Sequence, residues 1–193
     1  MSDNGLLDGK KILIVDDEPD VLDVLEEMLD MCKVVKASSF DEAKKYLESE
    51  NFDMAILDIM GVDGYKLLNI AKHRKITTVM LTANALSPDN LVKSIKEGAD
   101  SYLPKEEMSK ITTFLIDILK SQDEGESTWE PWHKRLSSSY FTKKWGGDWK
   151  DQDREFWERF KTGKVTTRRN TELQTSLSGQ VVEWLSSKTE EIC

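Results

Sequence analysis

Short apolar runs alternate with longer stretches of helical spacing between residues 11 and 120. Apolar residues are the majority in every run, and the continuous apolar run KILIV is typical of buried parallel strands. The runs cover residues 11–15, 33–37, 53–58, 76–82 and 100–104. Apolar residues at helical intervals predict helices over 19–31, 39–50, 64–74, 88–98 and 106–120. This alternation predicts an α/β domain whose doubly wound parallel sheet is covered on both faces.

Local signals support several of the predicted helix ends. Ser39 opens a Ser-Phe-Asp-Glu stretch, which is the pattern of a capping box at a helix N-terminus. Ser87 and Pro88 fit an N-cap followed by proline in the first helical position, and Gly98 fits the end of that helix.

Charged and hydroxyl side chains stand at the end of four of the five apolar runs or directly after it. Asp16 and Asp17 follow the first run, Asp58 ends the third, Thr82 ends the fourth, and Lys105 follows the fifth. In open α/β sheets, ligands bind at the carboxyl ends of the strands. These side chains are therefore the candidate functional residues.

Carboxylates held close together repel one another, which favours either raised pKa values or a bound cation. An all-oxygen cluster with room for water suits Mg²⁺. Beside such an ion, Asp58 can remain charged and act as a nucleophile toward phosphorus. Lys105 and the Thr82 hydroxyl can then bind two oxygens of a transferred phosphoryl group.

Over about residues 9–120 the sequence resembles the receiver domain of two-component response regulators. The stretches that carry the resemblance are ILIVDDEPDVL, ILDI followed by DGYKLL, VMLTA, and EGADSYLPK. It implies a flavodoxin-like, five-stranded sheet with strand order 2-1-3-4-5. It also implies that Asp58 is the phosphoacceptor, that Asp17 binds Mg²⁺ directly and Asp16 through water, and that the Met60 carbonyl is a further ligand.

The same resemblance implies a switch beyond the acceptor. Thr82 supplies the switch hydroxyl, Tyr102 is the aromatic residue that moves with activation, and Lys105 pairs with the phosphate. Taken singly, each residue has a simpler explanation. Asp17 can cap a helix, Thr82 can end a strand, Lys105 can be solvated, and Tyr102 can be packing. Only their coincidence at successive strand ends favours the functional interpretation.

Two stretches depart from the family pattern. Gly64 lies six residues after Asp58 and the usual proline is missing, so the loop is about two residues short. Glu106 stands where the family has a cis-proline after the lysine. A cis bond without proline costs roughly 2.5–4 kcal/mol, so we expect this bond to be trans or strained.

Composition changes after residue 120. Residues 121–128 are predicted to form a linker, 129–162 a Trp-rich helical extension, and 163–193 a polar tail. All six tryptophans lie in this third: Trp129, Trp132, Trp145, Trp149, Trp157 and Trp184. Three interpretations stay open: packing back onto the receiver, docking of a partner or a second copy (a homodimer), and stacking of single-stranded nucleic acid. The last lacks a basic groove.

The net charge of −9 argues against nucleic-acid binding, and no run is long enough to span a membrane. Two cysteines, Cys32 and Cys193, fit a reducing cytoplasm.

The sequence predicts a response regulator that is phosphorylated on Asp58 by a histidine kinase or phosphotransfer protein. It would signal to an unidentified downstream protein and turn over no external metabolite. The alternatives are an unphosphorylated pseudo-receiver scaffold and, less favoured, an Mg²⁺-dependent phosphatase.

Overall fold

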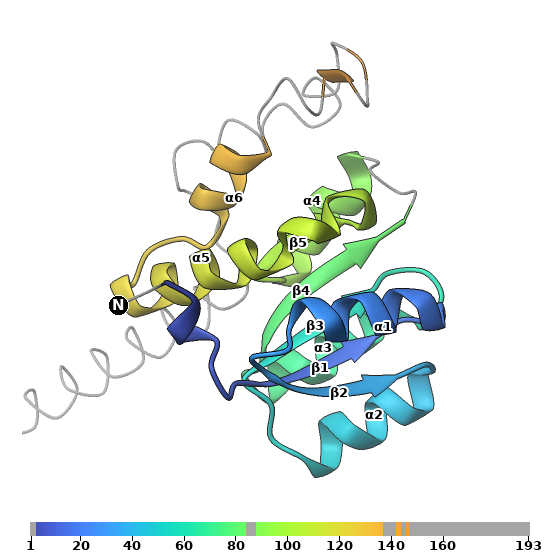
Figure 1. The fold of residues 1–193 in the computed structure, drawn as a ribbon. Helices are drawn as coiled ribbons and strands as arrows, with labels where there is room; N and C mark the ends of the chain where they lie inside the picture. Colours follow the sequence, from blue (N-terminus) through green and yellow to red (C-terminus); the bar gives the residue numbers. More distant parts are fainter. Residues whose placement is uncertain (1–2, 84–87, 137–141, 144–145, 147–193) are drawn as a thin grey trace, which may run out of the picture.

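Five parallel strands form one sheet in the order β2-β1-β3-β4-β5 (Figure 1). The computed structural model describes residues 3–83, 88–136, 142–143 and 146. The strands are β1 (Lys11–Val15), β2 (Lys33–Ala37), β3 (Met54–Asp58), β4 (Thr77–Thr82) and β5 (Ser101–Pro104). The predicted fold class and strand order are confirmed, and the last three strands each begin one residue later than predicted.

The register of the sheet aligns the carboxyl ends of the strands. Val15 of β1 pairs with Leu57 of β3, and Asp58 pairs with Leu81 of β4. Thr82 in turn pairs with Pro104 of β5. The residues at or just after these strand ends therefore share one edge of the sheet.

Helices cover both faces of the sheet. They are α1 (Pro19–Met28), α2 (Phe40–Ser49), α3 (Gly64–His73), α4 (Pro88–Glu97) and α5 (Ile111–Glu124). In Figure 1, α1 and α5 lie in front of the sheet and α3 lies behind it, where α3 contacts both α2 and α4. All residues of β3 and β4 are buried, as expected for strands enclosed on both sides.

The predicted helix signals are found in part. Ser39 caps α2, because its hydroxyl accepts a hydrogen bond from Glu42 N at 3.4 Å. Gly98 follows α4 with φ of +86°, a left-handed conformation that favours glycine. Ser87 lies outside the described residues.

Helix α1 ends at Met28, three residues before the predicted end. The chain turns there, because Cys32 N donates to Leu29 O at 2.8 Å and Gly9 N donates to Met31 O at 2.9 Å. The Cys32 thiol is partly buried and contacts Leu7 O at 3.4 Å. Burial and nearby carboxylates raise the pKa of this thiol to about 11.

The segment after β5 differs from the prediction at both ends. A 3₁₀ helix, η2 (Lys105–Lys110), precedes α5, so the regular helix begins five residues later than expected. No peptide bond is cis in the described part of the chain, which makes the Lys105–Glu106 bond trans. Helix α5 runs on to Glu124 and ends at Gly125, with φ of +70°, so half of the predicted linker is helical.

A further helix, α6 (Trp129–Arg135), packs against α5. At the other end of the chain, the 3₁₀ helix η1 (Asp3–Leu6) also contacts α5. Most of the predicted extension and all of the tail lie outside the described residues, including Trp145, Trp149, Trp157 and Trp184. Among the described helices, none combines the length and apolar character needed to cross a membrane.

Candidate functional site

Asp58 ends β3 with its carboxylate held on both sides. The residue is 3% exposed. Its Oδ2 accepts hydrogen bonds from Met60 N at 3.0 Å and Gly61 N at 2.8 Å. Its Oδ1 lies 3.2 Å from Lys105 Nζ. The short loop thus turns two backbone amides toward one carboxylate oxygen and leaves the other to a cation.

Asp16 follows β1 and is fully buried. Its Oδ1 accepts hydrogen bonds from Glu18 N at 3.0 Å and Lys105 Nζ at 2.9 Å. Its Oδ2 has no aligned hydrogen-bond donor, although Lys105 Nζ lies 2.8 Å away. Burial raises the pKa of Asp16 above its ordinary value, and the hydrogen bond from Lys105 opposes this rise. A cation is needed here to keep the carboxylate charged.

Lys105 supplies that positive charge. Its Nζ lies within 3.2 Å of carboxylate oxygens of Asp16, Glu18 and Asp58. Burial alone would lower the pKa of Lys105, but its bonds to Asp16 and Glu18 raise that pKa well above its ordinary value. Glu18 was not among the predicted site residues. Its place in the Asp-Asp-Glu run after β1 is the signal that could have identified it.

Asp17 reaches the site by a different contact. Its side chain is exposed and lies against the main chain of Gly61. A Cβ on residue 61 would sit 1.9 Å from Asp17 Oδ1. Asp17 is therefore brought beside the loop that binds Asp58, and a side chain at position 61 would have to displace the Asp17 carboxylate. Sequence reasoning missed this role of Gly61, because the contact joins two separate strand ends.

Thr82 and Tyr102 lie on the neighbouring strands. Both are buried, at 1% and 0% exposure. Burial raises the pKa of Tyr102, with a smaller contribution from electrostatic interaction with Tyr65, and the nearby Thr82 hydroxyl acts in the opposite direction. Thr82 Oγ1 nevertheless has no well-aligned hydrogen-bond partner among the residues that the structure describes. This buried hydroxyl, on the strand next to the one that ends in Asp58, thus has unused hydrogen-bonding capacity.

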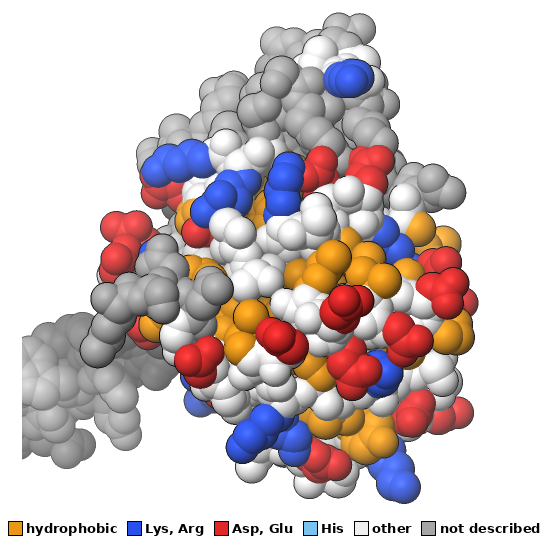
Figure 2. All heavy atoms as spheres, in the orientation of Figure 1, with side chains coloured by type: hydrophobic (Ala, Val, Ile, Leu, Met, Phe, Trp, Pro, Cys, Tyr) orange, Lys and Arg blue, Asp and Glu red, His pale blue; other side chains and the backbone are white. Residues whose placement is uncertain are grey.

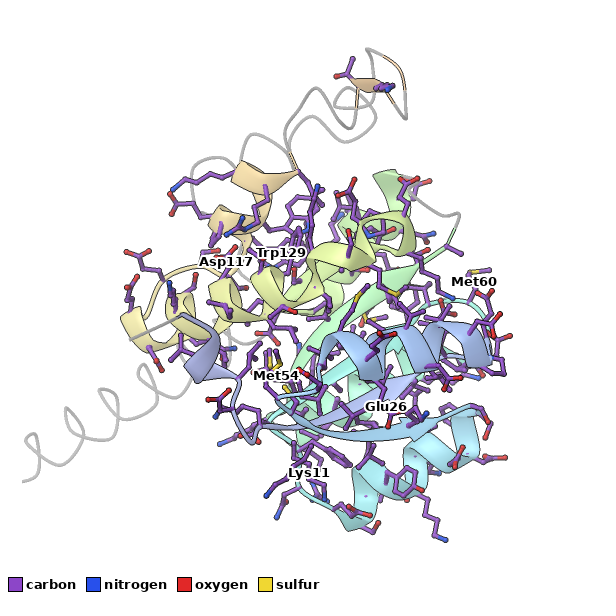
Figure 3. All side chains as sticks on the ribbon, in the orientation of Figure 1. Lys11, Glu26, Met54, Met60, Asp117 and Trp129 are labelled. Atoms are coloured by element: carbon purple, nitrogen blue, oxygen red, sulfur yellow. The ribbon has the colours of Figure 1, made fainter. Side chains whose placement is uncertain are left out.

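The oxygen donors fit Mg²⁺ in their chemistry but do not form a complete cage. In the part of the chain that the structure describes, no three acidic, histidine or cysteine side chains are grouped to hold a metal. Asp17 and Asp58, however, meet at Gly61, and Mg²⁺ needs only one or two carboxylates when water completes its shell. Met60 contacts Asp58 through its N–H, so its carbonyl remains only a predicted ligand. Its side chain is 74% exposed and lies at the periphery of the molecule (Figure 3).

Comparison with known proteins identifies the family of the domain. A family model described as the response regulator receiver domain matches residues 12–115. The two-component response regulator ARR18 of Arabidopsis thaliana is 38% identical over 104 residues, which cover 50% of this chain and 16% of that protein. The chain spans less than half the length of this and several other curated relatives, some of which are named transcriptional regulators.

Solved structures share the fold. A CheY-like receiver domain protein from Methanospirillum hungatei JF-1 is 28% identical with a TM-score of 0.51, covering 59% of this chain and 98% of that one. A response regulator from Burkholderia pseudomallei is 24% identical with a TM-score of 0.51, covering 60% and 72% of the two chains. That protein was solved with a phosphorylated aspartic acid, a calcium ion and citrate.

Proposed function

Because the chain belongs to the response regulator receiver domain family, we propose that it accepts a phosphoryl group on Asp58 and signals through protein contacts. The donor would be a histidine kinase or a phosphotransfer protein. One observation carries the proposal: a buried carboxylate has one oxygen fixed by two amides and the other beside Lys105. This arrangement orients a nucleophile and places a positive charge next to it.

The chemistry follows from the two oxygens of Asp58. Oδ2 is bound to the amides of Met60 and Gly61, so Oδ1 is the oxygen that attacks phosphorus. A P–O bond forms while the P–N bond to the donor histidine breaks, and the imidazole keeps the electron pair and takes up a proton. Lys105 Nζ pairs with the transferred group, and the Thr82 hydroxyl donates to another of its oxygens.

Mg²⁺ would be held by Asp17 and Asp58, with Asp16 acting through water. When bound, the ion supplies positive charge that offsets the negative phosphoryl oxygens. Lys105 would then release part of its contact with Asp16, whose buried carboxylate gains the ion as a second source of positive charge. The response regulator from Burkholderia pseudomallei was solved with a phosphorylated aspartic acid and a calcium ion, which supports this proposal.

The readout would be a change around Thr82 and Tyr102. Phosphorylation would draw Thr82 toward Asp58, and Tyr102 would fill the space that Thr82 leaves. Acidic side chains are prominent on the right of the face in Figure 2, which fits a protein partner better than nucleic acid. Catalysis would be limited to the modification of the chain itself, and a cytoplasmic location remains a prediction.

The direct test is incubation with Mg²⁺ and acetyl phosphate, followed by intact mass. The wild type should gain one phosphoryl group and Asp58→Asn none. Asp23→Asn is a matched control, because Asp23 is an exposed acid on α1 that pairs with Lys36, and it should label like the wild type. Equal labelling of Asp58→Asn would move the acceptor elsewhere. No labelling of the wild type would favour an unphosphorylated scaffold.

A further inference from the structure

The start of the Trp-rich extension binds the free edge of the sheet. Among the described residues, β5 pairs with β4 alone, so its outer edge presents main-chain groups that need partners. Three side chains of residues 128–132 donate to carbonyls of the segment that contains β5. Thr128 Oγ1 donates to Asp100 O at 2.6 Å, Trp129 Nε1 to Ala99 O at 3.2 Å, and Trp132 Nε1 to Tyr102 O.

Apolar burial and an ion pair hold the same segment in place. Trp129 and Trp132 are 5% and 1% exposed, and their rings meet edge to face with centroids 5.2 Å apart. Figure 3 labels Trp129 of α6 and Asp117 of α5. Arg135 Nη2 donates to Asp117 Oδ1 at 2.9 Å, which fixes the end of α6 to α5.

One residue joins this surface to the acceptor site. The side chain of Tyr102 is buried beside Thr82, while its carbonyl accepts the indole hydrogen bond of Trp132. Thr82 lies on β4, next to the strand that ends in Asp58. A continuous path of contacts therefore runs from the acceptor strand through Thr82 and Tyr102 to Trp132. Such a path carries coupling only if its parts have two arrangements.

We propose that the outer edge of β5 is a docking surface whose occupant is the chain's own segment 128–136, and that this docking is coupled to Asp58 through Tyr102. The coupling rests on the proposed function, whereas the docking does not. In the structure, segment 128–136 is docked and the side chain of Tyr102 is buried. The proposed switch assigns this buried position of Tyr102 to the phosphorylated state. Docking should therefore favour that state, and phosphorylation should in turn strengthen docking, since linkage between two sites is reciprocal.

The docking part is tested on the full chain by hydrogen exchange of the indole N–H groups, assigned with Trp129→Phe and Trp132→Phe. Both indoles should exchange at least about tenfold more slowly than in the urea-unfolded chain. Exchange of Trp132 at the unfolded rate would overturn the docking.

The coupling part is tested by titration with trifluoroberyllate, a mimic of the phosphoryl group, in the presence of Mg²⁺. Trp132→Phe keeps an aromatic ring but removes the indole N–H that donates to Tyr102 O. Trp129→Phe is the matched variant, because it removes the indole N–H that donates to Ala99 O. Affinity should fall about fivefold or more in Trp132→Phe and stay within about twofold of wild type in Trp129→Phe. Unchanged affinity in Trp132→Phe, or an equal loss in both variants, would overturn the coupling.

Failure of the proposed function gives a different result. If the wild type neither gains a phosphoryl group by mass nor binds trifluoroberyllate, the acceptor role fails and the coupling fails with it. Indole exchange still decides the docking in that case. If the wild type is phosphorylated normally and Trp132→Phe binds like wild type, the proposed function stands and only the coupling is wrong.

Discussion

The strand-end site and the outer edge of β5 meet opposite electrostatic needs. At the strand ends, buried carboxylates of Asp16 and Asp58 gather around one ammonium group, that of Lys105. At the β5 edge, neutral carbonyls accept hydrogen bonds from neutral hydroxyl and indole donors. The first region should therefore respond to pH and cations. The second should respond to the loss of volume or of a donor, and little to pH.

The largest expected effect is the loss of Trp132. Replacing this buried side chain with alanine leaves a cavity at the β5 edge, which should lower the free energy of unfolding by about 3–5 kcal/mol. Urea denaturation at pH 6 and pH 8 would measure it. The loss should be the same at both values, because the carbonyl that accepts the indole hydrogen bond is neutral. If the loss of unfolding free energy differed clearly between pH 6 and pH 8, the β5 edge would not be insensitive to pH, and the contrast with the strand-end site would fail.

Gly61→Ala should act on the charged region. The new Cβ would displace the Asp17 carboxylate, so affinity for Mg²⁺ should fall about tenfold or more, as for other changes that misplace a metal ligand. Calorimetric titration with Mg²⁺ would measure it. Gly5→Ala is the matched control, since a Cβ there meets nothing closer than 4.0 Å. Equal affinity in all three proteins would remove Asp17 from the proposed ligands.

Thr128→Val should have a smaller effect on the β5 edge. The variant keeps the shape of the side chain but removes the donor to Asp100 O, which should lower the free energy of unfolding by about 1 kcal/mol. Thr113→Val on α5 is a suitable control, because no hydrogen bond of the Thr113 side chain is found in the described structure. If the two variants are equally stable, the Thr128 hydrogen bond contributes nothing.

The smallest expected effect is the pH dependence due to Asp16. Burial raises its pKa in the folded chain above the ordinary 3.8, so the folded state binds more protons in the window between these two pKa values. Stability should therefore fall as pH rises from about 4 through this window. In Asp16→Asn this fall should be reduced. An identical pH profile for the two proteins, followed by thermal unfolding, would show that Lys105 cancels the effect of burial.

Much of the sheet could be predicted because its signals are local. The runs KILIV and KVVKA have the bounds of β1 and β2, and the strand-end rule places Asp16, Asp58 and Lys105 together as the structure does. The 3₁₀ helix after Lys105 could not be predicted, since the spacing of apolar residues from Met108 onward fits a regular helix. The roles assigned to the site residues remain proposals.

The parts that escaped prediction depend on contacts between distant segments. No local pattern indicates that Gly61 must leave space for Asp17. The tryptophan pair was consistent with packing, with partner docking or with stacking. Trp129 and Trp132 pack back onto the domain. The three interpretations remain open for the other four tryptophans, which lie outside the described residues. Trp129 and Trp132 are held by hydrogen bonds to main-chain carbonyls. Every residue has such a carbonyl, so the side chains in and before β5 give no signal that could predict this contact.

That last feature bears on how this helix could evolve or be reused. The three donors bind the main-chain carbonyls of residues 99, 100 and 102. The side chains at those positions can therefore change without removing the acceptors. Binding of this segment therefore requires a strand whose main-chain carbonyls have suitable positions, and it does not require a particular amino-acid sequence in that strand. A related domain with an open outermost strand should accept the same nine-residue segment as a graft.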